Sequence, residues 1–343
     1  MTGTGIVRDD LFLEHDPGRY HPESPERLRS IYQHLDNGCW SDLTCLPRRM
    51  ATREEITLIH RPEHFERIAR TDGQIQCQLD ADTPTSAGSF QAALAAAGGL
   101  ITLVEKVVDG EMDNGFALVR PPGHHAEANR AMGFCLFNNV AIAAKWAIIH
   151  RSLKRVMIVD WDLHHGNGTQ HAFYADPRVL YLSIHQYPHY PGTGGLGESG
   201  RAEGLGYNIN VPLAWGHGDQ EYVAIFQKIV QPVARLYRPE LILVSAGFDI
   251  NQNDPLGDMM VTRPGFAAMA RLLKNIAEEV CRKRLVFTLE GGYDIQAQTS
   301  AISEVLDVLQ GKSSCGDSLS NQNLPEPAII QEVRRNQANF WSF

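Results

Sequence analysis

The sequence lacks a run of basic residues and an apolar stretch long enough to span a membrane. Its 31 lysine and arginine residues are outnumbered by 40 aspartate and glutamate residues, which gives a formal net charge of −9 over 343 residues. A negative chain without a basic cluster is poorly suited to coating nucleic acid, so we expect no direct nucleic-acid binding. The most apolar helical stretch, residues 92–104, is shorter than the ~20 residues that cross a bilayer, so we expect no membrane insertion.

The sequence also shows no Cys-x-x-Cys motif and no internal repeat, and we expect no secretory leader. Residues 1–10 contain no basic start followed by an apolar segment, which a signal peptide requires. No two cysteines form a Cys-x-x-Cys motif, and reduced thiols in a cytosolic compartment are the simplest interpretation. We therefore expect a cytoplasmic protein. The six cysteines are Cys39, Cys45, Cys77, Cys135, Cys281 and Cys315.

What is present is a regular alternation of short apolar runs and longer amphipathic segments from about residue 115 onward. The runs predict strands at 116–119, 155–160, 179–185, 240–247 and 284–289, and the segments predict helices at 138–151, 217–237 and 264–282. Thr262 and Pro264 are a typical start for the last helix. Strands that alternate with helices predict an α/β fold with a parallel sheet covered on both faces.

Polar residues and glycines follow the carboxyl ends of four predicted strands. Ligands of open α/β sheets bind at that edge, so we expect the four loops to converge on one site. The loops read Pro121-Pro122-Gly123-His124-His125, Asp160-Trp161-Asp162, Ser245-Ala246-Gly247-Phe248-Asp249 and Glu290-Gly291-Gly292-Tyr293.

The second of these loops carries two carboxylates and two imidazoles close together. Asp160, Asp162 and His164 alternate along it, and residues two apart on an extended segment point to the same face. Burying an unpaired carboxylate costs roughly several kcal/mol, so the cluster favours a bound cation. Oxygen and nitrogen ligands without thiolate indicate a catalytic divalent ion of the zinc type. The alternative is that the aspartates cap a helix and the histidines fill a polar loop.

In combination, these and neighbouring segments resemble the zinc-dependent histone deacetylase family, with details closer to its class II and bacterial branch of histone-deacetylase-like amidohydrolases. The resemblance covers roughly residues 10–310. It implies the arginase/deacetylase fold, in which one α/β domain surrounds a single eight-stranded parallel sheet flanked by helices. Besides the segments above, it depends on Gly133-Phe134-Cys135, Leu163-His164-His165-Gly166-Asn167-Gly168, Asp254-Pro255-Leu256-Gly257 and Leu289.

The resemblance implies a metal centre and a pair of histidines. Asp162, His164 and Asp249 match the zinc ligands of the family. His124 and His125 match its tandem active-site histidines, of which His125 is the expected general base and acid.

Three further residues match groups that support the reaction. Asp160 matches the carboxylate that contacts His124. Asn167 stands where class I members carry an aspartate, so His125 is expected to have no charged partner and a lower proton affinity. Tyr293 matches the tyrosine that donates a hydrogen bond to the scissile carbonyl.

The resemblance also implies a tunnel for the acyl-lysine side chain. Phe134, preceded by Gly133, and Tyr190 match the aromatic pair that lines it, although the family more often has phenylalanine at the second position. Asp82 matches a rim aspartate that holds the substrate backbone. A structural potassium ion is implied near Asp160, Asp162, His164, Ser183 and Ile184.

The implied reaction is zinc-dependent hydrolysis of acetyl or other acyl groups from lysine side chains of a protein or peptide. Acetylpolyamine amidohydrolases use the same catalytic residues on a small acylated amine. Polyamine-preferring relatives carry a glutamate where this chain has Leu256, so an acyl-lysine substrate is favoured. An arginase-type enzyme with two manganese ions needs further carboxylates that His165, Gly166 and Asn167 do not supply. An inactive acyl-lysine binding module is the alternative from another class.

The last part of the chain has a different composition. Residues 312–327 are rich in serine, asparagine and proline, and residues 328–339 are predicted to form a helix. We therefore expect a catalytic domain at 1–312 and a terminal segment at 313–343. This segment packs on the domain, or on a partner in a homo-oligomer.

Overall fold

The computed structural model describes residues 3–38, 40 and 42–343, so Cys39 and the first two residues lie outside it. An eight-stranded parallel sheet forms its centre, in the order β2-β1-β5-β10-β9-β6-β7-β8. The strands are β1 (Thr4–Val7), β2 (Leu43–Cys45), β5 (Asn114–Ala117), β6 (Val156–Asp160), β7 (Val179–Gln186), β8 (Asn208–Leu213), β9 (Leu241–Ala246) and β10 (Leu285–Leu289), with β3 (Cys77–Asp80) and β4 (Thr83–Thr85) in a separate antiparallel pair. The predicted fold class is confirmed.

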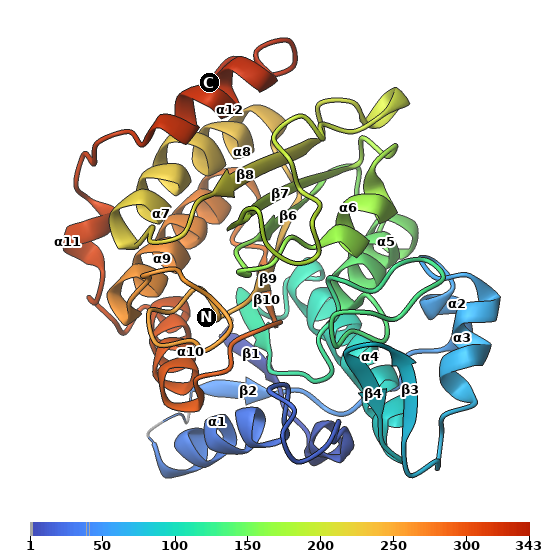
Figure 1. Ribbon diagram of the computed structural model, residues 1–343. Helices are drawn as coiled ribbons and strands as arrows, with labels where there is room; N and C mark the ends of the chain where they lie inside the picture. Colours follow the sequence, from blue (N-terminus) through green and yellow to red (C-terminus); the bar gives the residue numbers. More distant parts are fainter. Residues whose placement is uncertain (1–2, 39, 41) are drawn as a thin grey trace.

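Helices cover both faces of the sheet. One layer contains α1, α10, α9, α7 and α8, and the other contains α4, α5 and α6, with α2 and α3 outside it (Figure 1). The α-helices are α1 (Glu26–Asn37), α2 (Arg53–Ile56), α3 (Pro62–Ala69), α4 (Ser89–Val108), α5 (Asn139–His150), α6 (Asn167–Phe173), α7 (Asp219–Ile225), α8 (Gln231–Tyr237), α9 (Arg263–Val280), α10 (Ile295–Gln310), α11 (Asp317–Ser320) and α12 (Ala328–Gln337). Two short 3₁₀ segments, η1 (Asp10–Glu14) and η2 (Ala202–Gly204), and a π-helical turn, η3 (Phe226–Val230), complete the elements.

The register of the central strands brings the polar loops to one level. Asp160 at the end of β6 pairs with Ser245 of β9, and Ser245 in turn pairs with Thr288 of β10. Ala117 at the end of β5 also pairs with Thr288. The loops that follow these four strands therefore leave the sheet side by side at its carboxyl edge, as the strand pattern predicted.

Several predicted boundaries differ from the structure. The first predicted strand, 116–119, is β5 at 114–117, so that prediction was two residues too late. The long predicted helix at 217–237 is three consecutive helical segments with a π-helical turn in the middle. The sequence pattern missed β1, β2 and β8. The first two are very short, and β8 contains two buried asparagines and a proline, a residue that a sheet tolerates at its edge.

The length argument against a membrane span was wrong for α4. This helix has 20 residues, and its most apolar window has a mean hydropathy of 1.4, so among the described residues it is the one helix long and apolar enough to cross a bilayer. However, 78% of that window is buried inside the protein, where α4 packs against α5 and against β1, β5 and β10. Such burial is typical of a core helix.

The terminal segment contacts the β8 side of the sheet. Helix α12 packs against β8, and α11 packs against α9. The indole nitrogen of Trp341 donates a 2.7 Å hydrogen bond to the carbonyl of Gly206. The Trp341 ring lies 5.7 Å from that of Tyr207 and 6.2 Å from that of Tyr237. In this structure, residues 313–343 therefore lie against the chain's own sheet and helices.

The buried ring of His60 makes stability dependent on pH. Its Nδ1–H donates to the carbonyl of Glu127 at 2.9 Å, and its Nε2 accepts from the amide of Asn138 at 2.8 Å. Both nitrogens of the neutral ring are therefore used. Burial and the neighbouring His64 lower the pKa of His60 to about 3. Because an unfolded histidine titrates near 6.5, falling pH favours the unfolded chain.

We predict that lowering the pH from 7 to 5 removes about 2 kcal/mol of unfolding free energy through this residue. Replacement of His60→Gln removes the titrating group, so this variant should lose less stability over the same interval, whatever its stability at pH 7. Urea unfolding at several pH values measures both slopes. His150→Gln, at an exposed position, is the control and should keep the wild-type slope. Equal slopes for His60→Gln and the wild type would contradict this account.

Candidate active site and metal centre

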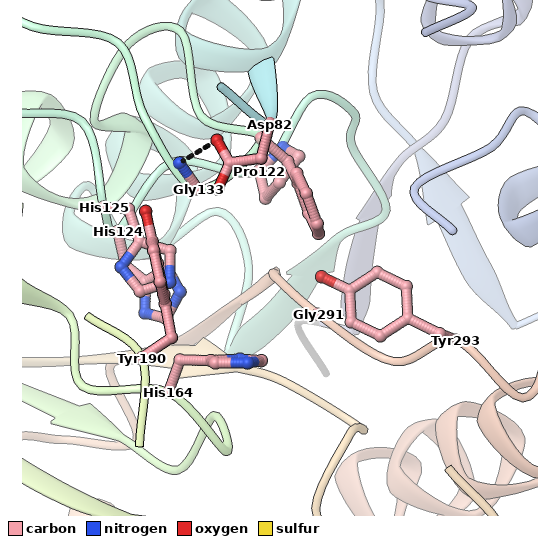
Figure 2. Close-up of a pocket in the computed structure, with 10 residues that line it drawn as sticks. Asp82, Pro122, His124, His125, Gly133, His164, Tyr190, Gly291 and Tyr293 are labelled. Atoms are coloured by element: carbon pink, nitrogen blue, oxygen red, sulfur yellow. Dashed lines mark hydrogen bonds between the residues drawn. The ribbon is translucent and has the colours of Figure 1, made fainter. Parts of the chain in front are cut away.

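A cavity of about 190 Å³ opens at the carboxyl edge of the sheet. Loops that follow β3, β5, β6, β7 and β10 contribute to its lining. The loop after β9 reaches the same place through Asp249, which contacts His164, so the predicted convergence of loops is observed. In Figure 2, the hydroxyl of Tyr293 points across the cavity. The residues on the opposite side are His124, His125, His164 and Tyr190. The lining residues are Asp82, Pro122, His124, His125, Gly133, Phe134, His164, Tyr190, Gly291 and Tyr293.

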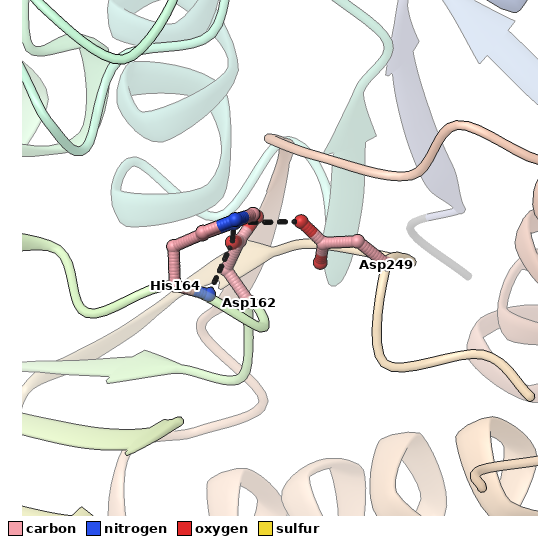
Figure 3. A group of neighbouring side chains, drawn as sticks. All are labelled: Asp162, His164 and Asp249. Atoms are coloured by element: carbon pink, nitrogen blue, oxygen red, sulfur yellow. Dashed lines mark hydrogen bonds and ion pairs between the residues drawn. The ribbon is translucent and has the colours of Figure 1, made fainter. Parts of the chain in front are cut away.

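Asp162, His164 and Asp249 form a buried cluster at this cavity. One potential ligand atom from each lies within 4.8 Å of the other two. The Nδ1 atom of His164 is 3.2 Å from an oxygen of Asp162 and 3.1 Å from an oxygen of Asp249 (Figure 3). In the described part of the chain, no other group of three or more histidine, cysteine or acidic side chains meets the same geometric condition.

The electrostatics of this cluster favour a cation. Burial and the charge of Asp162 raise the pKa of Asp249 to about 7. Burial opposes the charged form of His164, but hydrogen bonds to both carboxylates outweigh it and raise the pKa of His164 to about 9. The two carboxylates thus stabilise positive charge at Nδ1 between them. A divalent cation would neutralise both, and one nitrogen with two carboxylates suits a zinc-type ion.

His124 lies beside this cluster and is tied to Asp160. Its Nδ1–H donates to Asp160 at 3.1 Å, and the hydroxyl of Tyr181 donates to the same oxygen at 2.9 Å. Its Nε2 is 3.7 Å from Asp162. Burial opposes protonation of the ring, but Asp162 and Asp160 outweigh it and raise the pKa of His124 to about 10. The predicted contact between Asp160 and His124 is therefore present.

His125 is held by Asn167. Its Nδ1–H donates to the amide oxygen of Asn167 at 2.8 Å, so Nε2 is the ring nitrogen left for chemistry. Burial and the neighbouring His124 hold the pKa of His125 well below its usual value. Sequence analysis expected no charged hydrogen-bond partner at this position, and among the described residues the partner of the His125 ring is the neutral amide of Asn167. However, the amide nitrogen of Asn167 donates at 2.6 Å to Glu127, so a carboxylate lies one hydrogen bond further away.

The Tyr293 loop is held through its backbone. Arg27 donates to the carbonyls of Glu290 and Gly292, each at 2.6 Å, and its guanidinium carbon lies 5.0 Å from the Tyr293 ring centre. The amide of Gly291 donates to Asp162 at 2.8 Å. A Cβ on Gly291 would lie 2.2 Å from an oxygen of Asp249, so only glycine permits this close approach.

The walls of the cavity contain the predicted tunnel residues. The ring of Phe134 is edge-on to Tyr293 at 5.9 Å, and that of Tyr190 is edge-on to His125 at 5.1 Å. Gly133 has a φ of +55°, and a Cβ there would lie 2.4 Å from the His125 ring, so a larger residue would displace His125. Asp82 accepts a hydrogen bond from the Gly133 amide at 3.2 Å.

Seven predicted site residues lie outside the cavity lining. Four of them contact residues of the lining, namely Asp160, Asp162, Asn167 and Asp249. The other three are Leu256, Ser183 and Ile184. Leu256 is half-buried, and its amide donates to Asp254 at 3.0 Å. Ser183 and Ile184, which the family resemblance placed near potassium, are buried on β7, where Ser183 pairs with Asp160 across the sheet. The hydroxyl of Ser183 is bonded to His185 at 2.9 Å.

Sequence analysis gave no role to two charged residues that shape the site, Glu290 and Arg27. Glu290 accepts from the amides of Gly123 and His124, at 2.7 and 3.2 Å, and from the hydroxyl of Ser245 at 3.0 Å. The signal for Glu290 was its place directly after a buried strand. Arg27 had no such signal, because it bonds to backbone atoms distant in sequence.

A buried ion cluster holds Arg27 itself. The carboxylate of Glu23 accepts a hydrogen bond from Arg27 at 3.0 Å. It also accepts from two nitrogens of the Arg120 guanidinium, Nε and Nη2. All three side chains are fully buried. Removing one partner of a buried ion pair leaves an uncompensated charge, so the three side chains stay together. Because Arg27 lies on α1 and bonds to the loop after β10, the cluster fixes α1 against that loop.

Comparison with known proteins supports the family resemblance that the sequence motifs indicated. The family model described as histone deacetylase domain matches residues 21–309. Histone deacetylase 5 of Arabidopsis thaliana is 39% identical over 358 residues, which cover 98% of this chain and 54% of the relative. A probable deacetylase of Archaeoglobus fulgidus is 40% identical over 296 residues, which cover 85% of this chain and 82% of the relative.

A solved structure agrees with the fold and the sequence similarity. The crystal structure of the HDA15 HD domain superposes with a TM-score of 0.91 at 36% identity, covering 99% of this chain and 95% of that one. The chain spans about half the length of histone deacetylases 5 and 18 of Arabidopsis thaliana, 54% and 52% respectively. With most of its length matched by the family model and by these relatives, the chain belongs to the histone deacetylase family.

Proposed function

We propose that the protein is a zinc-dependent deacylase that hydrolyses the amide of an acylated lysine side chain in a protein or peptide. One observation carries the proposal: the Asp162, His164 and Asp249 cluster lies at a cavity that also contains His125 and Tyr293. The family membership supports the same reaction class. Asp162, His164 and Asp249 would hold the zinc ion. When bound, zinc polarises the substrate carbonyl and lowers the pKa of a water molecule toward ~7.

His125 would act as the base and acid. Its Nδ1–H is engaged by Asn167, so Nε2 is the atom that takes the proton from water and returns it to the leaving lysine nitrogen. A lowered pKa keeps the ring neutral and able to accept that proton. Such proton transfer contributes roughly 10² to 10⁴ in rate.

Tyr293 would stabilise the oxyanion. Burial raises the pKa of its hydroxyl well above the usual value, so the group stays protonated and able to donate a hydrogen bond. Phe134 and Tyr190 would enclose the lysine alkyl chain, because both rings line the cavity. Asp82 at the same cavity would accept hydrogen bonds from the substrate backbone.

A structural potassium ion near Asp160, Asp162, His164, Ser183 and Ile184 is also proposed, along with a cytoplasmic location. The potassium proposal is supported by the paired ends of β6 and β7, where these buried residues are concentrated. The cytoplasmic location is supported by the lack of a Cys-x-x-Cys motif in the sequence and by the free thiols of the five described cysteines.

We predict one zinc ion per chain, and loss of both zinc and activity in Asp162→Ala and Asp249→Ala. Each variant removes one of the three ligands, so only His164 and one carboxylate remain to hold the ion. Elemental analysis of the purified protein and a deacetylation assay measure the two losses. Asp176→Ala is the control, because this carboxylate pairs with Lys145 and Arg178 away from the site. Two manganese ions per chain, or full activity after chelation, would overturn the metal assignment.

We predict that Tyr293→Phe lowers kcat by about 10² or more while zinc stays bound, because the change deletes only an oxyanion donor. His125→Ala should be at least as damaging, and His124→Ala less so. Tyr237→Phe is a matched control, since its hydroxyl donates to the carbonyl of Pro177 away from the cavity. Near-wild-type turnover of Tyr293→Phe would show that the carbonyl is polarised by another group.

Substrate choice is tested at Leu256. An apolar side chain offers no partner to the second ammonium of an acetylated polyamine. We predict that acyl-lysine peptides have a higher kcat/KM than acetylated spermidine or putrescine. Leu256→Glu should shift the ratio toward polyamines by roughly 2- to 5-fold, the range expected for an exposed ion pair. Leu256→Gln controls for size. A wild-type preference for acetylated polyamines over every peptide tested would reverse the assignment.

A further inference from the structure

We propose that Asp254 is a positioning residue for Tyr293, and that it acts through the backbone of the loop that carries the tyrosine. Asp254 is only 7% exposed. One oxygen of its carboxylate accepts from the amide of Tyr293 at 2.6 Å and from the amide of Asp294 at 3.3 Å. The other oxygen accepts from the amide of Leu256 at 3.0 Å. The carboxylate therefore connects two loops at the carboxyl edge of the sheet.

The Tyr293 loop needs such an anchor because its own sequence is permissive. Gly291 and Gly292 precede the tyrosine, and Gly292 has a φ of +121°, a conformation that other residues rarely adopt. The glycines allow the loop to pass close to Asp249, but they also give its backbone many conformations in solution. The loop after β10 is therefore held by outside groups rather than by its own propensity.

Two side chains hold this loop, one through its carbonyl groups and the other through its amide groups. Arg27 holds the carbonyls of Glu290 and Gly292, and Asp254 holds the amides of Tyr293 and Asp294. Among the described residues, the Tyr293 hydroxyl has no hydrogen-bond partner of its own, and Figure 2 shows it pointing into the cavity. The position of the hydroxyl is therefore set by the backbone and by ring packing, so a small backbone shift would move the donor.

Asp254 also connects the Tyr293 loop to the turn at 254–257. Because the same carboxylate bonds to the Leu256 amide, the turn at 254–257 and the start of α10 are joined through one side chain. Asparagine at this position has one acceptor oxygen in place of two. It can hold one loop, and its amide hydrogens would face the N–H groups of the other.

The test is a double-mutant cycle with Asp254→Asn and Tyr293→Phe. If Asp254 acts through the tyrosine, Asp254→Asn should lower kcat by about 10-fold or more with KM changed less than about 3-fold and zinc retained. In Tyr293→Phe there is no hydroxyl left to misplace. The double variant should then fall no more than about 2-fold below Tyr293→Phe alone.

Asp219→Asn is the matched control. Asp219 likewise accepts from a backbone amide across two segments, that of Thr262 at 2.7 Å, but does not contact the Tyr293 loop. Its variant should keep the wild-type kcat. Independent losses that multiply in the Asp254→Asn, Tyr293→Phe double variant, or loss of zinc from Asp254→Asn, would overturn the inference.

Hydrogen exchange on the wild-type protein keeps the inference testable if Asp254→Asn does not fold. The amides of Tyr293 and Leu256 lie in loops, yet both should exchange slowly, because the buried carboxylate holds them. Exchange at the rate of exposed loop amides would contradict the role of Asp254.

This inference rests on the proposed function, and the experiments separate the two. A wild-type protein that hydrolyses no acylated amine would refute the deacylase proposal, whatever the exchange of these amides. An active wild type with multiplying losses in the double-mutant cycle would refute only the role of Asp254.

Discussion

The loops at the carboxyl edge of the sheet are held together by buried acidic side chains, because each buried carboxylate needs hydrogen-bond donors. Asp162 is a representative case: one oxygen accepts from the amide of His164 and the other from that of Gly291, at 2.9 and 2.8 Å. Because a buried carboxylate without donors is costly, each acid recruits N–H groups from neighbouring loops. The acids thus join the loops after β5, β6, β9 and β10. They are Asp160, Asp162, Asp249, Asp254 and Glu290.

This arrangement explains why a structural network and a reactive cavity occupy the same place. Acids that have enough backbone donors, such as Glu290, serve mainly to hold loops. Asp162 and Asp249 also lie close to each other, and the imidazole of His164 lies between them. Positive charge is stabilised at that point, next to the neutral ring of His125. A single edge of the sheet therefore provides both a metal-type donor set and a base, without any residue leaving its strand end or loop.

Much of this was predictable from particular residues. The alternation of Asp160, Asp162 and His164 identified two members of the metal-type cluster, Asp162 and His164. Asp160 contacts His124 instead, and Asp249 was expected only from the family resemblance. The polar residues after four apolar runs identified the edge of the sheet at which these side chains meet. The apolar pattern did not predict strands whose own sequence is short or interrupted by polar residues. Strand β8 was missed because Asn208 and Asn210 interrupt its apolar pattern, and β1 and β2 are too short to show any period.

The sequence by itself determined the fold class, the edge of the sheet that carries the site and the residue types available there, because strand and helix periodicity and the cost of burying charge are local properties. Only the tertiary structure decided which groups hold the loop of Tyr293. Arg27 and Asp254 bond to backbone atoms, whose hydrogen-bonding groups are the same in every residue type except proline. A backbone partner therefore leaves no trace in the sequence, and folding alone brings α1 and the turn at 254–257 onto the loop of Tyr293.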